Sequence, residues 1–427
     1  MSQVLQTDKK QHIVIVGGGM VGISLALMLS KRLPKKSVDI TLVEQYPLQQ
    51  SSVAKQASFD DRSTALSAGT ADLLQKIDCW SCLEPYIQKI KCVHVSDKGH
   101  FGGIRLDAEK YDLDALGYVV ENKQLGRVLI NQLQQRVTSK AINCFAPSTV
   151  VNCTPKQSGY ELLVDTSSSE NKSQNESKQQ HRINADLVLV ADGADSSLRA
   201  SLGIGTNSID YKQTAFIANI SLDKYHNDIA YERFTDEGPI ALLPLPTLGG
   251  VHRAALVWTL PQEKAKEMKN EKPENIVEQL QQRFGFRMGK ITSIGERQYT
   301  PLTLITAQEQ VRSHLAIVGN AAHLLHPVAG QGLNLALRDC WVLSECLRVA
   351  ERKQIPFGQY SNLKIYLSEQ SMDQELTIGL TDGLVKLFSS SRLPKGVLRQ
   401  LGLFSLNALP LAKKQFAQKM MGLSKSL

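Results

Sequence analysis

The sequence predicts an α/β protein that combines a parallel sheet with an antiparallel sheet and ends in C-terminal helices. Three observations support this fold class. The chain begins with a strand, a glycine turn and a helix at residues 12–33, followed by a second apolar strand. Residues 183–260 contain several short runs of β-branched and aromatic residues, which favour strands. A further strand, glycine turn and helix start occupy residues 315–334.

The N-terminal segment has the pattern of a Rossmann-like dinucleotide-binding unit. Residues 12–16 form an apolar run, and three glycines follow it: Gly17, Gly19 and Gly22. These glycines permit a tight turn, close approach of the backbone to a diphosphate, and close packing of helix on strand. The helix expected at residues 23–33 ends at Pro34. Its N-terminus favours negative charge, so we expect the diphosphate there.

A second strand is expected at residues 38–43 and ends in Glu44. A carboxylate at this strand end can accept hydrogen bonds from the hydroxyl groups of a ribose. With strand, helix and acidic residue in place, an ordinary glycine turn is the weaker interpretation. The unit alone does not separate FAD from NAD.

A second glycine turn lies far along the chain. Residues 315–318 form a short apolar run, followed by Gly319-Asn320-Ala321-Ala322 and then by Gly330-Gln331-Gly332-Leu333-Asn334, which opens a helix. A turn and a polar helix start so far from the first phosphate loop indicate one large cofactor held at two remote ends. FAD meets this requirement, because its adenosine and flavin ends lie far apart. The two motifs together predict a Rossmann-like FAD-binding domain with a parallel sheet.

The chain between the two motifs is rich in strands. Runs 160–164 and 183–190 predict a hairpin, and the Ser-, Asn-, Gln- and Lys-rich segment 166–180 predicts a flexible loop between them. Runs 214–220 and 253–258 predict an antiparallel sheet. We expect this sheet to be the base of a separate substrate domain.

The later segments return the chain to its starting domain. Residues 261–284 are charged and expected to be helical, while 300–302 and 315–318 are expected to rejoin the nucleotide-binding sheet. The FAD-binding domain is therefore expected to be discontinuous and interleaved with the substrate domain. The expected segments are 10–75, 115–205 and 300–350 for the FAD-binding domain, 76–114 and 206–299 for the substrate domain, and 351–427 for a C-terminal helical region.

Composition narrows the class and location of the protein. The chain of 427 residues is 42% hydrophobic, which suffices for one large core or two domains. No apolar run reaches the roughly 20 residues that span a bilayer, and the polar start is unlike a signal peptide. Seven cysteines at irregular spacing predict reduced thiols, and the pair Cys79 and Cys82 lacks the second pair of a zinc site. We therefore expect a cytoplasmic protein without a metal site.

The net charge of +8 is concentrated in the C-terminal tail. Residues 383–427 contain eight basic residues, no acidic residue and many Leu, Phe and Met side chains. Such a tail suits an anionic membrane surface, here the inner face of the membrane, or a partner protein. The alternative is a helix whose apolar side packs on its own domain. We expect no nucleic-acid partner, because the chain has no recognised binding module.

The motifs together resemble a known family. Three motifs carry this resemblance, in chain order: the glycine motif with Glu44, Asp192-Gly193 with Arg199, and Gly319 to Asn334. With these motifs the chain resembles the FAD-dependent aromatic hydroxylases of the para-hydroxybenzoate hydroxylase type. Within them the chain is most similar to the ubiquinone-biosynthesis hydroxylases, specifically the 2-polyprenyl-6-methoxyphenol hydroxylase group. The closer match lies in residues 60–66, 94–100, 116–121 and 377–384, and the resemblance runs over residues 10–425. Asn320 stands where most of the wider family has aspartate, and the ubiquinone branch shares this difference.

The resemblance implies roles at the flavin end. Asn320 would hydrogen-bond the ribityl chain, which an amide does as well as a carboxylate. The backbone amides of Gln331, Gly332, Leu333 and Asn334 would face the N1–C2 edge of the flavin, where the reduced ring carries its negative charge. Pro327 would fix the preceding turn, and His326 would line the site. No residue is identified as a firm catalytic acid or base.

The resemblance also implies roles at the diphosphate end. Arg62 would reach the diphosphate or the surroundings of the flavin, unless it forms an ordinary surface ion pair. Asn122 and Arg127 would begin a helix that lies along FAD. Asp192 and Gly193 would lie near the diphosphate, and the family links this segment to NADPH use.

The implied activity is that of a monooxygenase in ubiquinone biosynthesis. NAD(P)H would reduce FAD, O2 would form a C4a-hydroperoxyflavin, and one oxygen atom would pass to the ring of a polyprenylated phenol. The antiparallel sheet would provide an apolar wall for the prenyl chain. Other ubiquinone-biosynthesis proteins are expected partners. Three alternatives remain: a hydroxylase of another ring position or of a soluble phenol, a flavin reductase of prenyl double bonds, and a non-catalytic FAD-bound scaffold.

Overall fold

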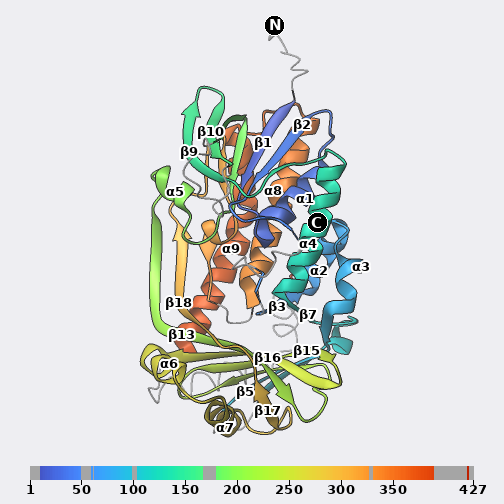
Figure 1. The fold of residues 1–427 in the computed structure, drawn as a ribbon, viewed down its shortest axis with the longest axis vertical. Coiled ribbons are helices and arrows are strands. Elements are labelled where there is room, and N and C mark those ends of the chain that lie inside the picture. Colours follow the sequence, from blue (N-terminus) through green and yellow to red (C-terminus); the bar gives the residue numbers. More distant parts are fainter. Residues whose placement is uncertain are drawn as a thin grey trace.

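The computed structural model describes residues 10–49, 59–60, 62–98, 103–166, 179–326, 330–388 and 421–422. Figure 1 shows a parallel sheet with its helices at one end of the long axis and an antiparallel sheet with its helices at the other. Two strands, β13 (Thr206–Leu222) and β18 (Gln298–Ala307), run between the two ends along one side.

The parallel sheet has six strands in the order β19-β20-β12-β1-β2-β8. Its neighbours are parallel except for the antiparallel pair β19 and β20. The strands are β1 (Gln11–Val16), β2 (Val38–Val43), β8 (Asn143–Phe145), β12 (Leu187–Val190), β19 (Val311–Arg312) and β20 (Leu315–Ile317). The strand order changes direction between β1 and β12, so this is the switch point of a doubly wound sheet.

Both faces of the parallel sheet are covered. Ile13 and Ile15 of β1 face the helical side, whereas Val14 and Val16 face a three-stranded sheet on the other side. The helices are α1 (Met20–Arg32), α2 (Ala68–Lys76), α3 (Trp80–Leu83), α4 (Asn122–Thr138), α8 (Gln331–Arg352) and α9 (Tyr360–Phe388). The covering strands are β9 (Thr149–Lys156), β10 (Gly159–Asp165) and β11 (Gln180–Ala185). Strands buried on both faces explain the continuous apolar runs in the sequence.

The second large sheet has nine strands and carries helices on its outer face. Eight strands follow the order β21-β18-β13-β16-β15-β14-β5-β6, and β17 also pairs with β13. The remaining bounds are β5 (Cys92–Asp97), β6 (Gly103–Asp107), β14 (Ile229–Phe234), β15 (Pro239–Leu248), β16 (Val251–Pro261), β17 (Ile291–Ile294) and β21 (His323–Leu324). The outer helices are α6 (Gln262–Lys269) and α7 (Pro273–Phe284), which pack on Phe216 and Trp258.

A small sheet lies between the two large ones. Its strands are β3 (Ser63–Ser67), β7 (Gly117–Glu121) and β4 (Ile87–Ile90), and all neighbours are antiparallel. Ile90 and Val119 pack on Leu245 and Ala255 of the nine-stranded sheet. The remaining short elements are α5 (Ser197–Ser201) and the 3-10 turns Glu84–Tyr86, Ala108–Tyr111 and Gly319–Ala321.

Several expected elements are confirmed, and two expectations are wrong. The strand–helix–strand unit at the N-terminus and the antiparallel pairing of 214–220 with 253–258 are confirmed. Residues 183–190 do not form one strand. The chain breaks at Asp186, whose carboxylate accepts the backbone N–H of His12 at 2.7 Å, so β11 joins the hairpin with β10 while β12 joins the parallel sheet.

The second wrong expectation concerns residues 300–302. They belong to β18, which pairs with β13 in the antiparallel sheet, whereas β20 alone returns to the parallel sheet. A short β-branched run fits either sheet, so the sequence could not decide between them. The overall division into domains remains a prediction.

Two expectations fall largely outside the described residues. Of the loop 166–180, the structure describes only the ends, where the Thr166 N–H donates to the Gln179 carbonyl at 3.1 Å. Most of the basic tail also lies beyond the described part of the chain. Among the helices described, none has the length and apolar character needed to cross a bilayer.

Candidate functional site

The carboxyl ends of the parallel strands meet at one edge of the sheet. The N–H of Gly17 donates to the carbonyl of Val43 at 2.9 Å, and the N–H of Ala191 donates to that of Val16 at 2.7 Å. These bonds hold the turns after β2, β1 and β12 in a row. In open α/β sheets, ligands bind in the crevice at this edge, next to the switch point.

The glycines of the first motif are required by close backbone contacts. Gly17 has φ +107°, and a Cβ there would lie 2.4 Å from the carbonyl oxygen of Ala191. A Cβ on Gly22 would lie 1.9 Å from the carbonyl oxygen of Gly17. Gly19 forms the N-cap of α1 and leaves that helix start without a side-chain cap. Its free amides therefore face the crevice where a diphosphate is expected.

Glu44 is held against this glycine turn. Its carboxylate accepts the N–H of Gly18 at 2.5 Å and the N–H of Tyr46 at 2.9 Å. Burial raises the pKa of Glu44, and the backbone hydrogen bonds oppose this shift. A Cβ on Gly18 would approach the Glu44 side chain to 2.8 Å. The carboxylate thus marks the end of β2 beside the turn, where the ribose hydroxyls are expected.

Asp192 lies on the other side of the same turn. One carboxylate oxygen accepts the N–H of Leu198 at 3.4 Å, and the other is buried without a hydrogen-bond partner among the described residues. Burial raises the pKa of Asp192. Gly193 has φ +98°, and no described atom lies within 4 Å of a Cβ built there. A buried acceptor without a donor beside an open turn fits a hydroxyl-bearing cofactor such as FAD.

The second glycine turn adjoins the first one. Gly319 has φ +63°, and a Cβ there would lie 3.0 Å from a methyl group of Val21 in α1. Asn320 follows it with an exposed side chain. The turn at Gly319 and Asn320 therefore lies beside the first turn, and the part of the cofactor that each turn holds remains a prediction. Because β20 and β1 belong to one parallel sheet, their ends share an edge despite their distance in sequence.

The other end of the site is the start of α8. Gly330 has φ +61° and forms the N-cap, with no side-chain cap and no acidic residue in the first turn. The side-chain amide of Asn334 donates to the carbonyls of Ala65 (2.9 Å) and Gly330 (2.7 Å), and its oxygen accepts the N–H of Ser67 at 2.9 Å. The helix start is thereby tied to β3.

This helix start has the polarity expected for a flavin edge. No described atom lies within 4 Å of a Cβ built on Gly332, so a ring could approach the backbone there. Gln331 and Leu333 flank it in the same turn, and Gln331 is buried. Free amides and the helix dipole favour negative charge at this point.

Arg62 and Asn122 are brought together by Asp60. The Arg62 guanidinium donates to Asp60 at 2.6 Å, and the Asn122 amide donates to the same carboxylate at 3.2 Å. The Thr64 hydroxyl donates to Asn122 at 2.6 Å, which ties this group to β3. Sequence reasoning missed Asp60 as the residue that positions the other two. Arg127 does not join them, because it lies on the exposed face of α4 and donates to Gln124 at 3.3 Å.

His326 is buried and uncharged at neutral pH. Burial lowers its pKa to about 4. Its ring meets the edge of Tyr211 at a centroid distance of 5.6 Å, and the Tyr211 hydroxyl donates to Asp382 at 2.8 Å. The expected neighbour Pro327 lies outside the described residues. These contacts suit a lining role better than a charged one.

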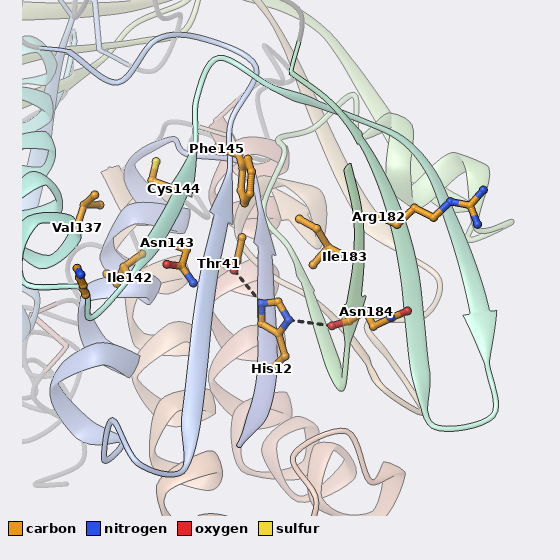
Figure 2. A pocket seen from close by; sticks show the side chains of 11 residues that line it. His12, Thr41, Val137, Ile142, Asn143, Cys144, Phe145, Arg182, Ile183 and Asn184 are labelled. Atoms are coloured by element: carbon orange, nitrogen blue, oxygen red, sulfur yellow. Dashed lines mark hydrogen bonds between the residues drawn. The ribbon is translucent and has the colours of Figure 1, made fainter. Parts of the chain in front are cut away.

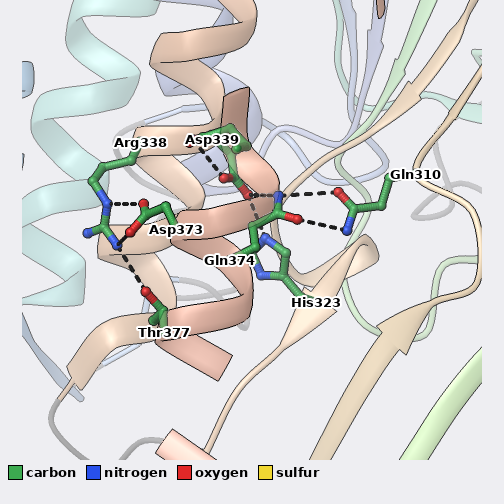
Figure 3. Close-up of polar contacts among 8 residues, drawn as sticks. Gln310, His323, Arg338, Asp339, Asp373, Gln374 and Thr377 are labelled. Carbon is green, nitrogen blue, oxygen red and sulfur yellow. Dashed lines mark hydrogen bonds and ion pairs between the residues drawn. The ribbon is translucent and has the colours of Figure 1, made fainter. Parts of the chain in front are cut away.

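Figure 3 shows a buried polar cluster behind the second motif. The His323 ring lies 2.5 Å from the carboxylate of Asp339 in α8, which also accepts the amides of Gln370 (2.9 Å) and Gln374 (3.1 Å). Gln374 and Gln310 exchange a second pair of hydrogen bonds. This cluster ties β21 to α8 and α9. The sequence did not predict this contact, because His323 lies in β21 and Asp339 lies 16 residues later, within α8.

A hollow of about 560 Å³ lies at the opposite end of the parallel strands (Figure 2). It is lined by His12 at the start of β1 and by Asn143 at the start of β8. The His12 ring nitrogens already contact the Thr41 hydroxyl and the Asn184 carbonyl, each at 2.8 Å. The hollow is therefore separate from the crevice at the glycine turns.

A smaller hollow of about 220 Å³ lies between the small sheet and the nine-stranded sheet. It is lined by Arg62 together with Glu121 of β7, Asn219 of β13 and Arg253 of β16. Arg253 donates to Glu121 at 3.1 Å across the gap. The inner face of the antiparallel sheet therefore reaches the residues around Arg62.

Residues 10–356 match the family model described as an FAD binding domain. The ubiquinone hydroxylase UbiL of Rhodospirillum rubrum is 32% identical over 418 residues, which cover 97% of this chain and 90% of that relative. The human mitochondrial ubiquinone biosynthesis monooxygenase COQ6 is 30% identical over 462 residues, which cover 97% and 93%. The chain belongs to the FAD-dependent hydroxylases of ubiquinone biosynthesis.

This hydroxylase also shares its fold with a solved structure. The p-nitrophenol 4-monooxygenase PnpA from Pseudomonas putida superposes with a TM-score of 0.72 at 14% identity, over 99% of this chain and all of that one. The family assignment confirms the expected α/β fold, the FAD cofactor and the flavoprotein hydroxylase class. The roles of individual residues in the site remain predictions.

The open space at Gly332 gives a direct test of the flavin edge. Gly332→Ala should leave the fold of the hydroxylase intact, since no described atom lies within 4 Å of the added methyl group. It should weaken FAD binding by about 5- to 150-fold, because overpacking by one methyl group costs about 1–3 kcal/mol. FAD titration of the apoprotein measures the effect. Gly379→Ala, equally open on exposed α9, is the control, and an unchanged affinity in Gly332→Ala would place the flavin elsewhere.

Burial of His326 should make the stability of the hydroxylase pH-dependent. Its pKa falls from 6.5 to about 4 on folding, so the unfolded chain binds more protons between these values. The free energy of unfolding is therefore highest above about pH 6.5 and decreases as the pH falls toward 4. Between pH 7.5 and pH 5 this loss amounts to about 2 kcal/mol.

Urea unfolding at the two pH values checks this expectation. The wild type should lose more free energy of unfolding between them than His326→Gln, whose side chain does not titrate. Equal losses in both proteins would show that His326 does not remain neutral in the folded state.

Proposed function

We propose that this hydroxylase inserts one oxygen atom of O2 into the ring of a polyprenylated phenol of the 2-polyprenyl-6-methoxyphenol type. NAD(P)H is the proposed electron donor, and the second oxygen atom leaves as water. The proposal is supported by one arrangement above all. The start of α8 is tied through Asn334 to β3 of the small sheet, and the small sheet packs through Ile90 and Val119 on the inner face of the large antiparallel sheet.

Individual residues of the chain are proposed to bind different parts of FAD. Glu44 and Asp192 offer acceptors on either side of the glycine turn, and the open start of α1 suits the diphosphate. The open start of α8 suits the pyrimidine edge of the flavin. FAD, when bound, supplies the redox chemistry that activates O2. Asn320, Arg62 and Asn122 are proposed to orient it from the sides.

The chain also has to hold the phenol and exclude water. Apolar residues of the inner sheet face, including Val257 and Ile217, are proposed to seat the ring and the first part of the prenyl chain. Fixed geometry of this kind lowers the barrier because the reacting groups meet without further loss of entropy. Neutral His326 is proposed to line the site without adding charge.

Such a substrate dissolves in a bilayer, so access to the membrane surface is part of the proposal. The tail 383–427, with eight basic residues and no acidic one, is proposed to bind the anionic inner face of the membrane from the cytoplasm. Association with other ubiquinone-biosynthesis proteins is proposed on the same basis, since these handle the same lipid-soluble intermediates.

The proposed reaction is tested with purified FAD-loaded protein, NADPH and isotopically labelled O2. Addition of a short-chain 2-prenyl-6-methoxyphenol should stimulate NADPH oxidation, and one labelled oxygen atom should appear in the ring. Product without label would indicate a reductase, and bound FAD without turnover would indicate a scaffold. Deletion of the gene should cause the matching phenol to accumulate, and accumulation of another ring-substituted precursor would change the proposed position.

A further inference from the structure

The two faces of the nine-stranded sheet differ in what covers them. Ala230 of β14, Leu245 of β15 and Ala255 of β16 pack on the small sheet that adjoins the cofactor crevice. Their strand neighbours, such as Tyr231 and Leu256, pack instead under α6 and α7. Side chains alternate along a strand, so every second residue of β14 faces the crevice side.

Glu232 is the next residue of β14 after Ala230 on the crevice side. In the register of the sheet it lies opposite Val95 of β5 and Ala241 of β15. The row continues through Val257 of β16 to Ile217 of β13. Glu232 is therefore a single carboxyl in an apolar row on the face proposed to seat the phenol.

The carboxyl of Glu232 has no partner among the described residues. Two basic residues on this side of the sheet have other carboxylate partners: Arg253 is bonded to Glu121, and Arg62 is bonded to Asp60. Burial alone raises the pKa of Glu232 to about 7. The side chain is nevertheless only half-buried, so part of its surface stays accessible to a ligand.

An unpaired carboxyl in apolar surroundings costs folding free energy and calls for a function. Buried polar groups in native proteins are nearly always hydrogen-bonded, and strongly shifted pKa values are concentrated at functional sites. The phenolic hydroxyl is the polar group that the proposed substrate would bring to this face. One acceptor in a row of apolar side chains matches an aromatic ring with one hydroxyl.

We propose that Glu232 is a catalytic residue that binds the ring hydroxyl of the phenol and accepts its proton. The O–H bond of the phenol breaks, its electron pair stays on the ring oxygen, and the proton bonds to the carboxylate oxygen of Glu232. The negative charge thereby moves from the carboxylate to the ring, which becomes more electron-rich and easier to hydroxylate. This inference rests on the proposed function.

Proton transfer from the phenol is easier to a carboxylate with a raised pKa than to an ordinary exposed one. A phenol has a pKa near 10 and an ordinary glutamate near 4.3, so proton transfer between them is strongly uphill. A glutamate with a pKa near 7 narrows that gap while it remains about half charged at neutral pH. Its row neighbours Val95, Ala241 and Val257 carry no side chain that could accept the proton instead.

The test compares a short-chain prenylated phenol with its methyl ether, which lacks the transferable proton. Binding to the FAD-loaded protein is followed by the change in the visible flavin spectrum. The wild type should bind the phenol about 10- to 100-fold more tightly than the ether, as expected for a hydrogen bond to a charged group. Glu232→Gln should bind the two ligands with similar affinity.

Turnover gives the second readout. In Glu232→Gln, kcat for the phenol should fall about 100-fold, and the rise of kcat around pH 7 seen in the wild type should disappear. Glu263→Gln removes the same charge from exposed α6 and serves as the control, with both readouts unchanged. Glu232→Asp retains the carboxylate and should restore part of the pH dependence.

The outcomes separate the inference from the function on which it rests. If Glu232→Gln keeps the preference for the phenol and the wild-type pH profile, the role of Glu232 is overturned while the hydroxylase function stands. If the wild type neither binds nor hydroxylates the phenol, the proposed substrate is wrong and the role of Glu232 is overturned with it. Should Glu232→Gln fail to take up FAD, Glu232→Asp decides the matter with the same two ligands.

Discussion

The close approach of three backbone turns at the carboxyl edge of the parallel sheet governs the arrangement of this protein. A side chain at Gly17 would collide with Ala191, and one at Gly22 would collide with Gly17. Gly319 closes the group from the third side against Val21. Because these contacts leave no room for a Cβ, only glycine permits the turns to pack this closely, and the uncapped start of α1 lies among them at one edge of the sheet. The acceptors of Glu44 and Asp192 lie on either side of them.

A cofactor as long as FAD needs a second support, and α8 provides it. The start of this helix is tied to β3 by Asn334 and braced behind by the pair His323 and Asp339. β3 in turn belongs to the small sheet, which packs on the nine-stranded sheet. The parts that would touch the cofactor and the substrate are thus joined by short chains of direct contacts. Rigid supports of this kind keep a site in its productive geometry.

Local features of the site could be predicted from the sequence, whereas long-range ones could not. The strand ending at Val16, the helix after it and the carboxylate of Glu44 follow from a motif of adjacent residues. The break at Asp186 was not predicted, because the residues on both sides of it are largely apolar although β11 and β12 belong to different sheets. Residues 300–302 were assigned to the wrong sheet, since short strand patterns do not name their partners.

The remaining features that the sequence did not predict are contacts between residues far apart in the chain. The contact of His323 with Asp339 crosses from a strand to a helix, and Asp60 joins Arg62 to Asn122 across another turn. The position of Glu232 on the crevice side depends on the register of β14 with its neighbours. A single sequence does not reveal how strands are aligned with one another. Alternation of apolar and polar residues separates the two faces of a strand, but it does not identify the elements that pack on each face.

The most direct test is an experimental structure of the purified protein with FAD. The account predicts the adenosine ribose at Glu44, the diphosphate over the start of α1, and the pyrimidine edge of the flavin at the amides of Gln331 to Leu333. A flavin bound away from the start of α8, or FAD in the hollow beside His12, would contradict it.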